Sequence, residues 1–478
     1  MPAPDFKYLK HIIEKPEFRL IGEEAGTMGV EVYLVGGYVR DVLIGRRSKD
    51  ADLVVVGDGI AFAKHMARVM GFADKITVFK NFQTAHLKTK EMELEFVGAR
   101  KESYSRHTRN PQVQQGTLED DLSRRDFTIN TLAISVNKND YGNLVDLFKG
   151  WDDLKKGIIK TPLAPGTTFS DDPLRMMRAI RFAAQLQFRI QPQTLNAIAE
   201  HRERISIITQ ERITDELNKI MASSHPSVGF KLLMKTGLLH LIFPELVALH
   251  GVETINGHSH KDNFFHTLQV LDNLAGMSDN LWLRWAALLH DIGKPSSKRF
   301  EEEGGWTFHG HEVIGERMIP KLFRKLKLPL NDKMKYVQKI VALHLRPIAL
   351  AQEEVSDSAL RRLLVEAGDD IEDLFLLCRA DITSKNEEKV ERYLARFDKV
   401  WERLEVVEKK DQMRNWKPPI TGEIVMETFG IKPGPEVGKI KHQVREAILS
   451  GDIPNKYDAA FEYMLKAGKD MGLKKVKS

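Results

Sequence analysis

One segment, residues 33–56, constrains the fold more than any other part of the chain. An apolar run at residues 32–35 predicts a short strand, and Gly36 and Gly37 follow it directly. Glycine lets the backbone approach a ligand closely, and the first amides of a helix favour an anion. Residues 38–44 have the pattern of such a helix, in which Arg40 adds a charged donor. The segment therefore predicts a phosphate-binding turn between a strand and a helix.

Two carboxylates follow this turn. Asp50 and Asp52 stand at the head of the apolar run 53–56, and side chains two residues apart in a strand face the same side. Because neighbouring carboxylates repel each other, such a pair usually implies a divalent cation. An isolated Asp-x-Asp pair is equally typical of surface carboxylates that cap a turn.

A third acid for this site is available on a later strand. Residues 75–79, 84–88 and 92–97 have strand patterns, and alternation in the last one places Glu93 and Glu95 on the same face. One of them is a candidate third metal ligand. The alternative is that both are solvated acids on a half-buried strand.

A polar stripe marks the helix that follows Pro173. Asp172, Arg175, Arg178 and Arg181 recur every three residues and wind obliquely around a helix. Cytosine and adenine both present an amine donor beside a ring-nitrogen acceptor, and a carboxylate next to a guanidinium complements that pair. Uracil and guanine invert the pattern. Asp172 and Arg175 are therefore candidate readers of C and A, and the alternative is a basic amphipathic helix with internal ion pairs.

The second half of the chain carries histidines and aspartates in helical segments. Imidazole and carboxylate groups that converge from several helices can hold a divalent metal. A lone histidine is usually structural, but six candidate ligands occur here in sequence order, namely His266, His290, Asp291, His311, His344 and Asp381.

Several motifs in the first half together resemble one family. They are the Gly37, Arg40, Asp50 and Asp52 segment, the Arg-Arg-Asp-Phe-Thr-Ile-Asn run at residues 124–130 and the Asp-Asp-Pro-Leu-Arg run at residues 171–175. This order is similar to that of the class II tRNA CCA-adding enzymes and their poly(A) polymerase relatives, within the polymerase-beta nucleotidyltransferase superfamily. Aspartate stands at position 171, where glutamate is common in the family.

The resemblance implies roles for particular residues. Asp50, Asp52 and, from its position before Arg100, Glu95 would hold Mg²⁺ and catalyse the transfer. The nucleotide would be bound by residues of all three motifs: Gly36, Gly37, Arg40, Arg125, Asp126, Asn130, Asp172, Arg175, Arg178 and Arg181. Glu211 and Arg212 would support the helix that carries the polar stripe.

The second half is similar to HD-domain metal phosphohydrolases, whose signature matches Ala-Leu-Leu-His-Asp-Ile-Gly-Lys at residues 287–294. This resemblance implies that His266, His290, Asp291 and Asp381 hold one ion and that His311 and His344 hold a second. A mixed imidazole and carboxylate set suits Mn²⁺, Ni²⁺ or Fe²⁺.

Length and composition fit a multidomain α+β protein. The 478 residues, 42% of them hydrophobic, are enough for three or four domains. We expect a nucleotidyltransferase head with a mixed sheet at 1–160, an all-α neck at 161–248, an all-α HD domain at 249–400 and a helical tail at 401–478. The N-terminus lacks the apolar core of a secretory signal, no run spans a bilayer, and a single cysteine, Cys378, excludes an intrachain disulfide. We therefore expect a cytoplasmic protein without a membrane partner.

The predicted function is template-independent addition of CCA to the 3′ end of tRNA from CTP and ATP, with release of pyrophosphate. A poly(A) polymerase, or an enzyme that adds only CC or only A, would share nearly every motif. A different class remains open as well, in which the chain is mainly an HD phosphohydrolase acting on nucleotides or RNA ends. The sequence makes no prediction of oligomeric state.

Three local expectations concern how the motifs are placed. Residues 100–115 are polar and contain a proline, which predicts a mobile loop. Ser123 is expected to cap a helix through Phe127 and Ile129, and Ser170 or Asp171 to cap the helix that begins at Pro173. Residues 281–292 are expected to form one helix that carries the His290–Asp291 pair.

Overall fold

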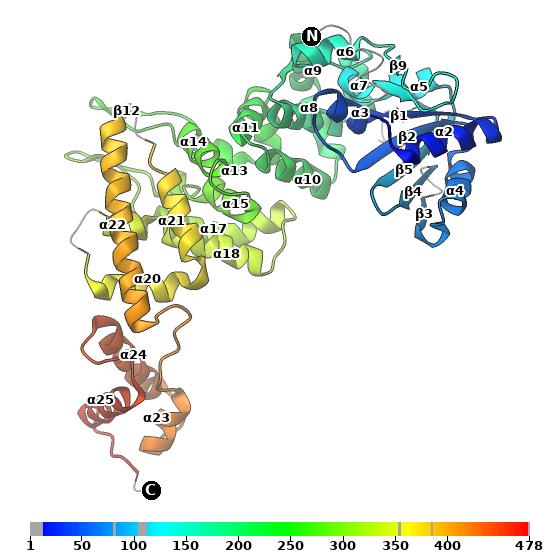
Figure 1. Cartoon of the computed structure of the whole chain (residues 1–478). Coiled ribbons are helices and arrows are strands. Elements are labelled where there is room, and N and C mark those ends of the chain that lie inside the picture. The colour runs from blue at the N-terminus through cyan, green and yellow to red at the C-terminus, as the bar shows by residue number, and fades with distance from the viewer. Residues whose placement is uncertain (1–12, 80–82, 104–111, 352–354, 384–385, 477–478) are drawn as a thin grey trace. The chain divides into compact units, whose positions relative to one another are not determined.

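The computed structural model describes residues 13–79, 83–103, 112–351, 355–383 and 386–476. Two units divide it, Met1–Val247 and Ala248–Ser478 (Figure 1). The first contains a sheet with helices and the second is almost entirely helical. The expected α+β fold class is confirmed.

A seven-stranded sheet forms the head, in the order β3-β4-β5-β2-β1-β8-β9. Only β2 and β5 run parallel, and the other neighbours are antiparallel. The strands are β1 (Glu31–Val35), β2 (Asp50–Val56), β3 (Ile76–Phe79), β4 (Thr84–Lys88), β5 (Glu93–Gly98), β8 (Ala133–Ser135) and β9 (Leu144–Val145). Both Asp50 and Asp52 lie within β2, so they share one face of the sheet as expected.

The two faces of the sheet have different roles. Helix α4 (Gly59–Val69) packs against β2, β4 and β5, where the rings of Phe62 and Phe96 meet edge to face with centroids 5.8 Å apart. Helix α2 (Pro16–Met28) contacts α4 and β1. Because Phe96 alternates with Glu95 along β5, Glu95 lies on the opposite face.

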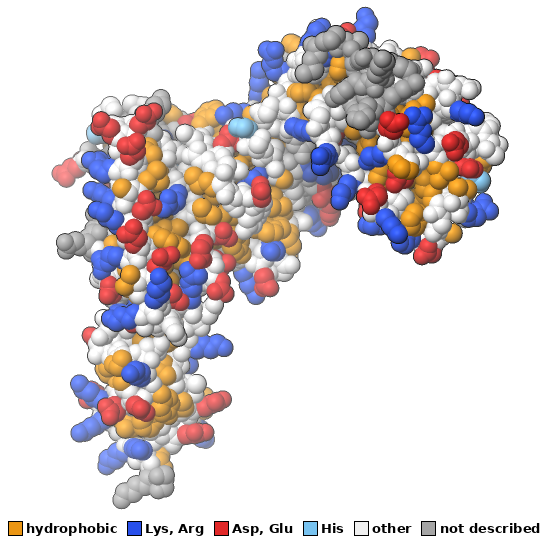
Figure 2. All heavy atoms as spheres, in the orientation of Figure 1, with side chains coloured by type: hydrophobic (Ala, Val, Ile, Leu, Met, Phe, Trp, Pro, Cys, Tyr) orange, Lys and Arg blue, Asp and Glu red, His pale blue; other side chains and the backbone are white. Residues whose placement is uncertain are grey.

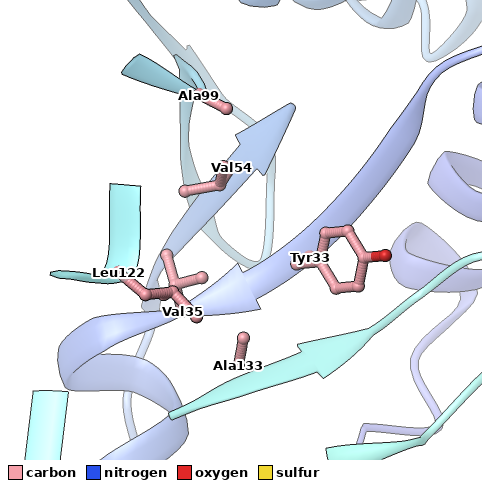
Figure 3. Packing of buried hydrophobic residues seen from close by; sticks show 6 residues of the cluster. All are labelled: Tyr33, Val35, Val54, Ala99, Leu122 and Ala133. Carbon is pink, nitrogen blue, oxygen red and sulfur yellow. The ribbon is translucent and has the colours of Figure 1, made fainter. Parts of the chain in front are cut away.

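A small cluster of buried apolar side chains packs on that opposite face of the sheet (Figure 3). Val54 follows Asp52 by two residues, so its side chain leaves β2 on the same side as the carboxylate. Its members come from the strands, from the residue that follows β5 and from the helix over residues 118–123. They are Tyr33, Val35, Val54, Ala99, Leu122 and Ala133. The carboxylates of β2 therefore stand beside tightly packed side chains.

The segment between β5 and β8 differs from expectation in two ways. Residues 100–103 and 112–115 pair as the antiparallel strands β6 (Arg100–Ser103) and β7 (Gln112–Gln115), so a loop is wrong for these residues, and the rest of the expected loop lies outside the described residues. Helix α5 (Leu118–Ser123) ends at Ser123 instead of beginning there. The reason is a capping box, in which Thr117 and Asp120 satisfy each other's backbone amides.

Helices make up most of the rest of the first unit, together with one short parallel strand pair, β10 (Ile158–Ile159) and β11 (Arg189–Ile190). Helix α8 (Leu174–Leu186) packs against α10 (Gln210–Met221) and α11 (Pro226–Lys235). Ser170 and Asp171 belong to α7, and it is Asp172 that accepts a hydrogen bond from the Leu174 amide at 3.2 Å, so the expected caps of α8 are wrong. The helices are α3 (Gly36–Leu43), α6 (Gly150–Lys156), α7 (Pro165–Asp171), α8 (Leu174–Leu186), α9 (Pro192–His201), α10 (Gln210–Met221), α11 (Pro226–Lys235), α12 (Leu238–Ile242) and α13 (Pro244–Val247).

The second unit stacks helices around the histidines. Helix α15 ends at Leu289, so His290 and Asp291 follow the helix and the expected single helix over 281–292 is wrong. The thiol of Cys378 is buried, and burial raises its pKa. The helices are α14 (Asn263–Ala275), α15 (Leu281–Leu289), α16 (Lys294–Ser297), α17 (His311–Lys325), α18 (Asp332–Leu343), α19 (Leu345–Leu350), α20 (Asp357–Ala367), α21 (Ile371–Ala380), α22 (Glu387–Asp411), α23 (Gly422–Phe429), α24 (Pro435–Ser450) and α25 (Tyr457–Asp470).

Helix α22 presents a charged outer face. Acidic and basic side chains alternate along it in Figure 2, and its buried residues are confined to Phe397, Val400, Leu404 and Val407. Mixed charges of this kind are typical of a solvated helix. No helix among the described residues combines the length and the apolar character needed to cross a membrane.

A close backbone contact between α6 and residues 128–130 is testable. A Cβ at position 150 would lie 2.1 Å from the carbonyl oxygen of Thr128, so Gly150→Ala should destabilise the first unit by about 1–3 kcal/mol. Gly26→Ala is the matched control, since nothing lies within 4 Å of its Cβ and alanine favours a helix. Calorimetry measures both variants. An unchanged transition in Gly150→Ala would show that this contact does not exist.

Candidate functional site

Gly36 brings the turn, a carboxylate and an arginine together. It opens α3 with φ of 71°, a left-handed conformation that glycine adopts without strain. A Cβ there would lie 2.9 Å from Nη1 of Arg125 and 3.1 Å from Oδ2 of Asp52. Only glycine at this position leaves room for these two side chains. Helix α3 begins at Gly36, two residues earlier than expected.

The parallel pairing of β2 with β5 sets the acids opposite one another. Asp52 pairs with Glu95, and Asp50 pairs with Glu93. Glu95 also lies 3.3 Å from Nε2 of His86 on β4. Burial raises the pKa of Asp52 to about 6, although the charge of Arg125 opposes the shift. A half-buried carboxylate beside two others suits a divalent cation, which would stabilise its charged form.

Buried hydrogen bonds link α3 to α8. Arg40 Nη1 donates to the side-chain oxygen of Asn130 at 2.9 Å, Asn130 Nδ2 donates to Asp126 at 2.9 Å, and Arg178 Nε donates to Asp126 at 2.7 Å. Burial favours the neutral acid, but Arg178 and Asn130 outweigh it and lower the pKa of Asp126 to about 2. Asp126 is thus a charged link that fixes α8 against the head. We call Arg40, Asn130, Asp126 and Arg178 the buried polar chain.

A second buried ion pair anchors the far end of the stripe. Arg181 Nη1 lies 3.1 Å from Glu216 on α10, and both side chains are buried. Sequence analysis selected Glu211 and Arg212 as the supports of α8 and missed Glu216. Glu216 lies on the same helix, α10, but a sequence does not show which acid of a helix faces inward.

These elements enclose a cavity of about 600 Å³. Asp172 and Arg175 both line it, and Arg175 Nη2 is held by the Arg124 carbonyl at 2.7 Å. The lining also includes residues from the turn, β2, the 124–130 run, α8 and α10, namely Gly36, Gly37, Arg40, Asp52, Arg124, Arg125, Asp126, Asn130, Leu174, Arg178, Arg181, Phe182, Gln185 and Arg212.

A second cavity, of about 870 Å³, lies on the other side of the carboxylates. Asp50, Asp52 and Glu95 line it, together with the basic side chains of Lys75, His86, Lys88 and Lys219. Asp52 and Arg178 line both cavities, so the two spaces meet at one carboxylate and one guanidinium.

The second unit brings all six predicted metal ligands together. Asp291 lies between two groups. Its Oδ2 is 3.3 Å from His290 and 3.8 Å from His266, and its Oδ1 is 3.3 Å from His311. His266 is 2.9 Å from Asp381, and the Nε2 atoms of His311 and His344 are 3.3 Å apart.

Hydrogen bonds orient every one of these imidazoles. Nδ1 of His290, His311 and His344 lies 2.7–2.8 Å from the carbonyl oxygens of Ala287, Phe308 and Val341, respectively. Nδ1 of His266 lies 3.0 Å from the Thr383 hydroxyl. The four Nε2 atoms therefore converge, and within the described chain Nε2 of His290 is buried without a hydrogen-bond partner. An orphaned buried nitrogen among acids fits a metal ligand.

Lys294 also lies beside the six predicted metal ligands, although it was not selected from the sequence. Its Nζ lies 2.6 Å from Asp291 Oδ2. The signal was its place at the end of the His-Asp-Ile-Gly-Lys run, four residues after His290. A lysine beside metal ligands places a positive charge where a phosphate would enter.

Comparisons with known proteins match three segments of the chain to protein families. Residues 32–160 match the model of the poly A polymerase head domain, residues 187–249 that of the probable RNA and SrmB-binding site of polymerase A, and residues 263–386 that of the HD domain. Both kinds of domain imply that divalent metals are used. The fold and site define a nucleotidyltransferase joined to an HD domain.

Full-length relatives narrow this class. The A-adding tRNA nucleotidyltransferase of Deinococcus radiodurans is 31% identical over 439 residues, 89% of this chain and 93% of that protein. The multifunctional CCA protein of Nitrosospira multiformis is 34% identical over 340 residues, 67% of this chain and 77% of that protein. The chain belongs to the tRNA nucleotidyltransferase and poly(A) polymerase family.

Solved structures share the fold. A CCA-adding enzyme in an apo form aligns with a TM-score of 0.65 at 23% identity and covers 97% of this chain and 99% of its own. The Thermotoga maritima CCA-adding enzyme, solved with tRNA, aligns with a TM-score of 0.60 at 22% identity over 97% and 98% of the two chains.

The Arg181–Glu216 pair gives a stability test. Glu216→Ala would leave the Arg181 guanidinium buried without its acid, which costs about 3–5 kcal/mol. Glu211→Ala on the same helix is the control, because Glu211 is exposed and should change stability by less than about 0.5 kcal/mol. Denaturant unfolding measures both. Equal stability of the two variants would contradict a role for Glu216 in holding α8.

Proposed function

We propose that the protein transfers CMP and AMP from CTP and ATP to the 3′ end of tRNA and releases pyrophosphate. The observation that carries this proposal is the first cavity, where the candidate base readers Asp172 and Arg175 and the candidate catalytic carboxylate Asp52 face the same space. A carboxylate accepts from the amine of C or A while a guanidinium donates to the ring nitrogen.

The remaining cavity residues are suited to hold a triphosphate. Gly36 and Gly37 expose backbone amides at the start of α3, and Arg40 and Arg125 add positive charge beside them. Arg178 and Arg181 are each paired with an acid, so they are held in place before a nucleotide arrives. Asp126 and Asn130 keep Arg40 and Arg178 oriented toward the cavity.

The reaction joins the two cavities at Asp52. The RNA 3′-hydroxyl attacks the α-phosphorus, and the bond to pyrophosphate breaks. Mg²⁺ ions held by Asp50, Asp52 and Glu95 would supply charge stabilisation at the α-phosphate and lower the pKa of the attacking hydroxyl. We assign the nucleotide to the first cavity and the RNA end to the second, whose lysines suit a phosphate backbone.

Addition of A alone is the second candidate, favoured by one observation. The relative from Deinococcus radiodurans, which aligns over 89% of this chain, is an A-adding enzyme. The deciding experiment offers tRNA that ends before CCA, and tRNA that already ends in CC, with each labelled nucleotide. Extension of the first substrate by C, C and A supports full CCA addition, whereas extension of only the second shows A addition. Long A tracts would indicate a poly(A) polymerase.

We propose that the HD cluster forms a separate phosphohydrolase site. His266, His290, Asp291 and Asp381 would bind one ion, and His311 and His344 a second, with Asp291 near both groups. Mixed nitrogen and oxygen ligands suit Mn²⁺, Ni²⁺ or Fe²⁺. Lys294 would attract and orient the substrate phosphate.

The domain limits 1–160, 161–248, 249–400 and 401–478 remain our proposal for the boundaries between head, neck, HD domain and tail. Localisation in the cytoplasm stays a prediction that rests on the sequence alone.

The carboxylate assignment predicts the effect of Asp52→Ala. This variant should lose nucleotide incorporation by at least about 10³-fold, because the carboxylate that lines both cavities is removed, while its affinity for tRNA changes little. Glu93→Ala, on the same face of the sheet but paired with Lys88, should keep most activity. Primer extension and filter binding measure the two quantities. Normal turnover in Asp52→Ala would remove the assignment.

The base-reading assignment predicts a change in selectivity. Asp172→Ala should incorporate UTP and GTP more readily relative to CTP and ATP, by about 10-fold or more, because the group that repels their carbonyl oxygens is gone. Competition between nucleotides in one reaction measures this ratio. Unchanged selectivity for C and A would show that Asp172 does not read the base.

The two metal sites should be separable, since they share no residue. The double change His290→Ala with Asp291→Ala should abolish metal-dependent hydrolysis of phosphate esters and spare tRNA extension. Both activities are assayed on the same preparation. Loss of both in a protein that still melts cooperatively would show that the sites are coupled, and equal hydrolysis before and after would make the cluster structural.

A further inference from the structure

A row of aromatic rings and ammonium groups leads away from the HD cluster. It is built around two short hairpins, β12 (Thr254–Ile255) with β13 (His258–Ser259), and β14 (Arg299–Glu301) with β15 (Gly305–Thr307). Trp306 lies on β15, whereas His260, Lys298 and Phe308 each lie one residue outside a strand. Neither hairpin supplies a residue of the HD cluster. The row comprises Lys294, Phe308, His260, Trp306 and Lys298, and we call it the aromatic rim.

Measured contacts connect the aromatic rim to the cluster. Lys294 Nζ, 2.6 Å from Asp291, lies 5.6 Å from the centre of the Phe308 ring. The ring centres of Phe308 and His260 are 5.8 Å apart, and those of His260 and Trp306 are 5.5 Å apart. Lys298 Nζ lies 4.4 Å from the centre of the Trp306 ring. The row therefore runs unbroken from a metal-ligand carboxylate to a second lysine.

The hairpins hold these rings in place. Trp306 Nε1 donates to the carbonyl oxygen of His258 at 3.2 Å, which joins one hairpin to the other. Gly305, at φ of 73°, leaves room for the His258 ring, 3.3 Å from where a Cβ would lie. His260, Trp306 and Phe308 all remain partly exposed, unlike the fully buried Trp285 of the core. Ring surface is thus available to a ligand.

The aromatic rim lies where the cluster is accessible. The side chains of His266, Asp381 and Lys294 are 12%, 16% and 18% exposed, whereas those of His290 and Asp291 are 1–2% exposed. Lys294 is thus the most exposed of these five side chains, and it is also the first member of the aromatic rim.

We propose that the aromatic rim is a nucleobase-binding subsite for the HD centre. Aromatic faces stack on any base, and the ammonium of Lys294 would hold the phosphate against the metal ligands. The HD centre would then take nucleotides in preference to phosphate esters without a base. This inference rests on the proposed HD phosphohydrolase, but the subsite is testable without hydrolysis.

Photolabelling of the metal-loaded full chain with 8-azidoadenosine 5′-monophosphate tests the subsite by location. Peptides that contain residues 299–308 should be labelled. Excess AMP should protect them, and excess ribose 5-phosphate should not. Label in the nucleotidyltransferase head serves as an internal reference. Trp306→Ala should lower labelling of the 299–308 peptides by about 5-fold or more relative to the head, and Trp306→Phe should retain it.

Trp416→Ala is the matched control, because it removes another partly exposed indole that bonds to Asn455, away from the aromatic rim. Label confined to the head, equal protection by ribose 5-phosphate, or unchanged label in Trp306→Ala would each overturn the proposal. Labelled 299–308 peptides in a protein without HD hydrolysis would overturn the hydrolytic function and leave the subsite standing.

Discussion

The ion pair between the buried Asp126 carboxylate and the half-buried Arg178 guanidinium is the interaction on which the first unit depends. It joins the segment after α5 to helix α8, and Asn130 extends it to Arg40 on α3. Removing one partner of such a pair leaves an uncompensated buried charge. The pair therefore fixes where α8 lies, and α8 and the residue before its N-cap carry Arg175 and Asp172. If α8 shifted freely, the candidate base readers Asp172 and Arg175 would have no defined position relative to the carboxylates on β2.

Close packing at the glycine turn supplies the second constraint. Gly36 allows Asp52 and Arg125 to approach the first turn of α3, and the parallel register of β2 and β5 places Glu95 opposite Asp52. The second unit uses a different device, because hydrogen bonds at Nδ1 turn four imidazoles toward one point. In each site, groups that do not react themselves thus orient the side chains that would bind a metal.

Sequence patterns predicted those features that depend on neighbours along the chain. Alternation predicted the strands that carry Asp52 and Glu95. The spacing of residues predicted the polar stripe, whose members line one cavity in the structure. The start of α5 was also visible in Thr117 and Asp120, but Ser123 competed as a cap and was preferred wrongly. Pairing across long separations was not predictable. Arg181 with Glu216, Arg178 with Asp126 and Lys294 with the aromatic rim depend on tertiary packing that no local pattern specifies.

We propose that protein side chains, above all Asp172, read the incoming base. The most direct measurement compares CTP with its analogue lacking the 4-amino group, pyrimidin-2-one ribonucleoside triphosphate, in single-turnover extension by the unaltered protein and by Asp172→Ala. The account predicts that the unaltered protein prefers CTP by about 10-fold or more, the value of one good base contact, and that Asp172→Ala shows no preference. The same preference for CTP in both proteins would contradict it.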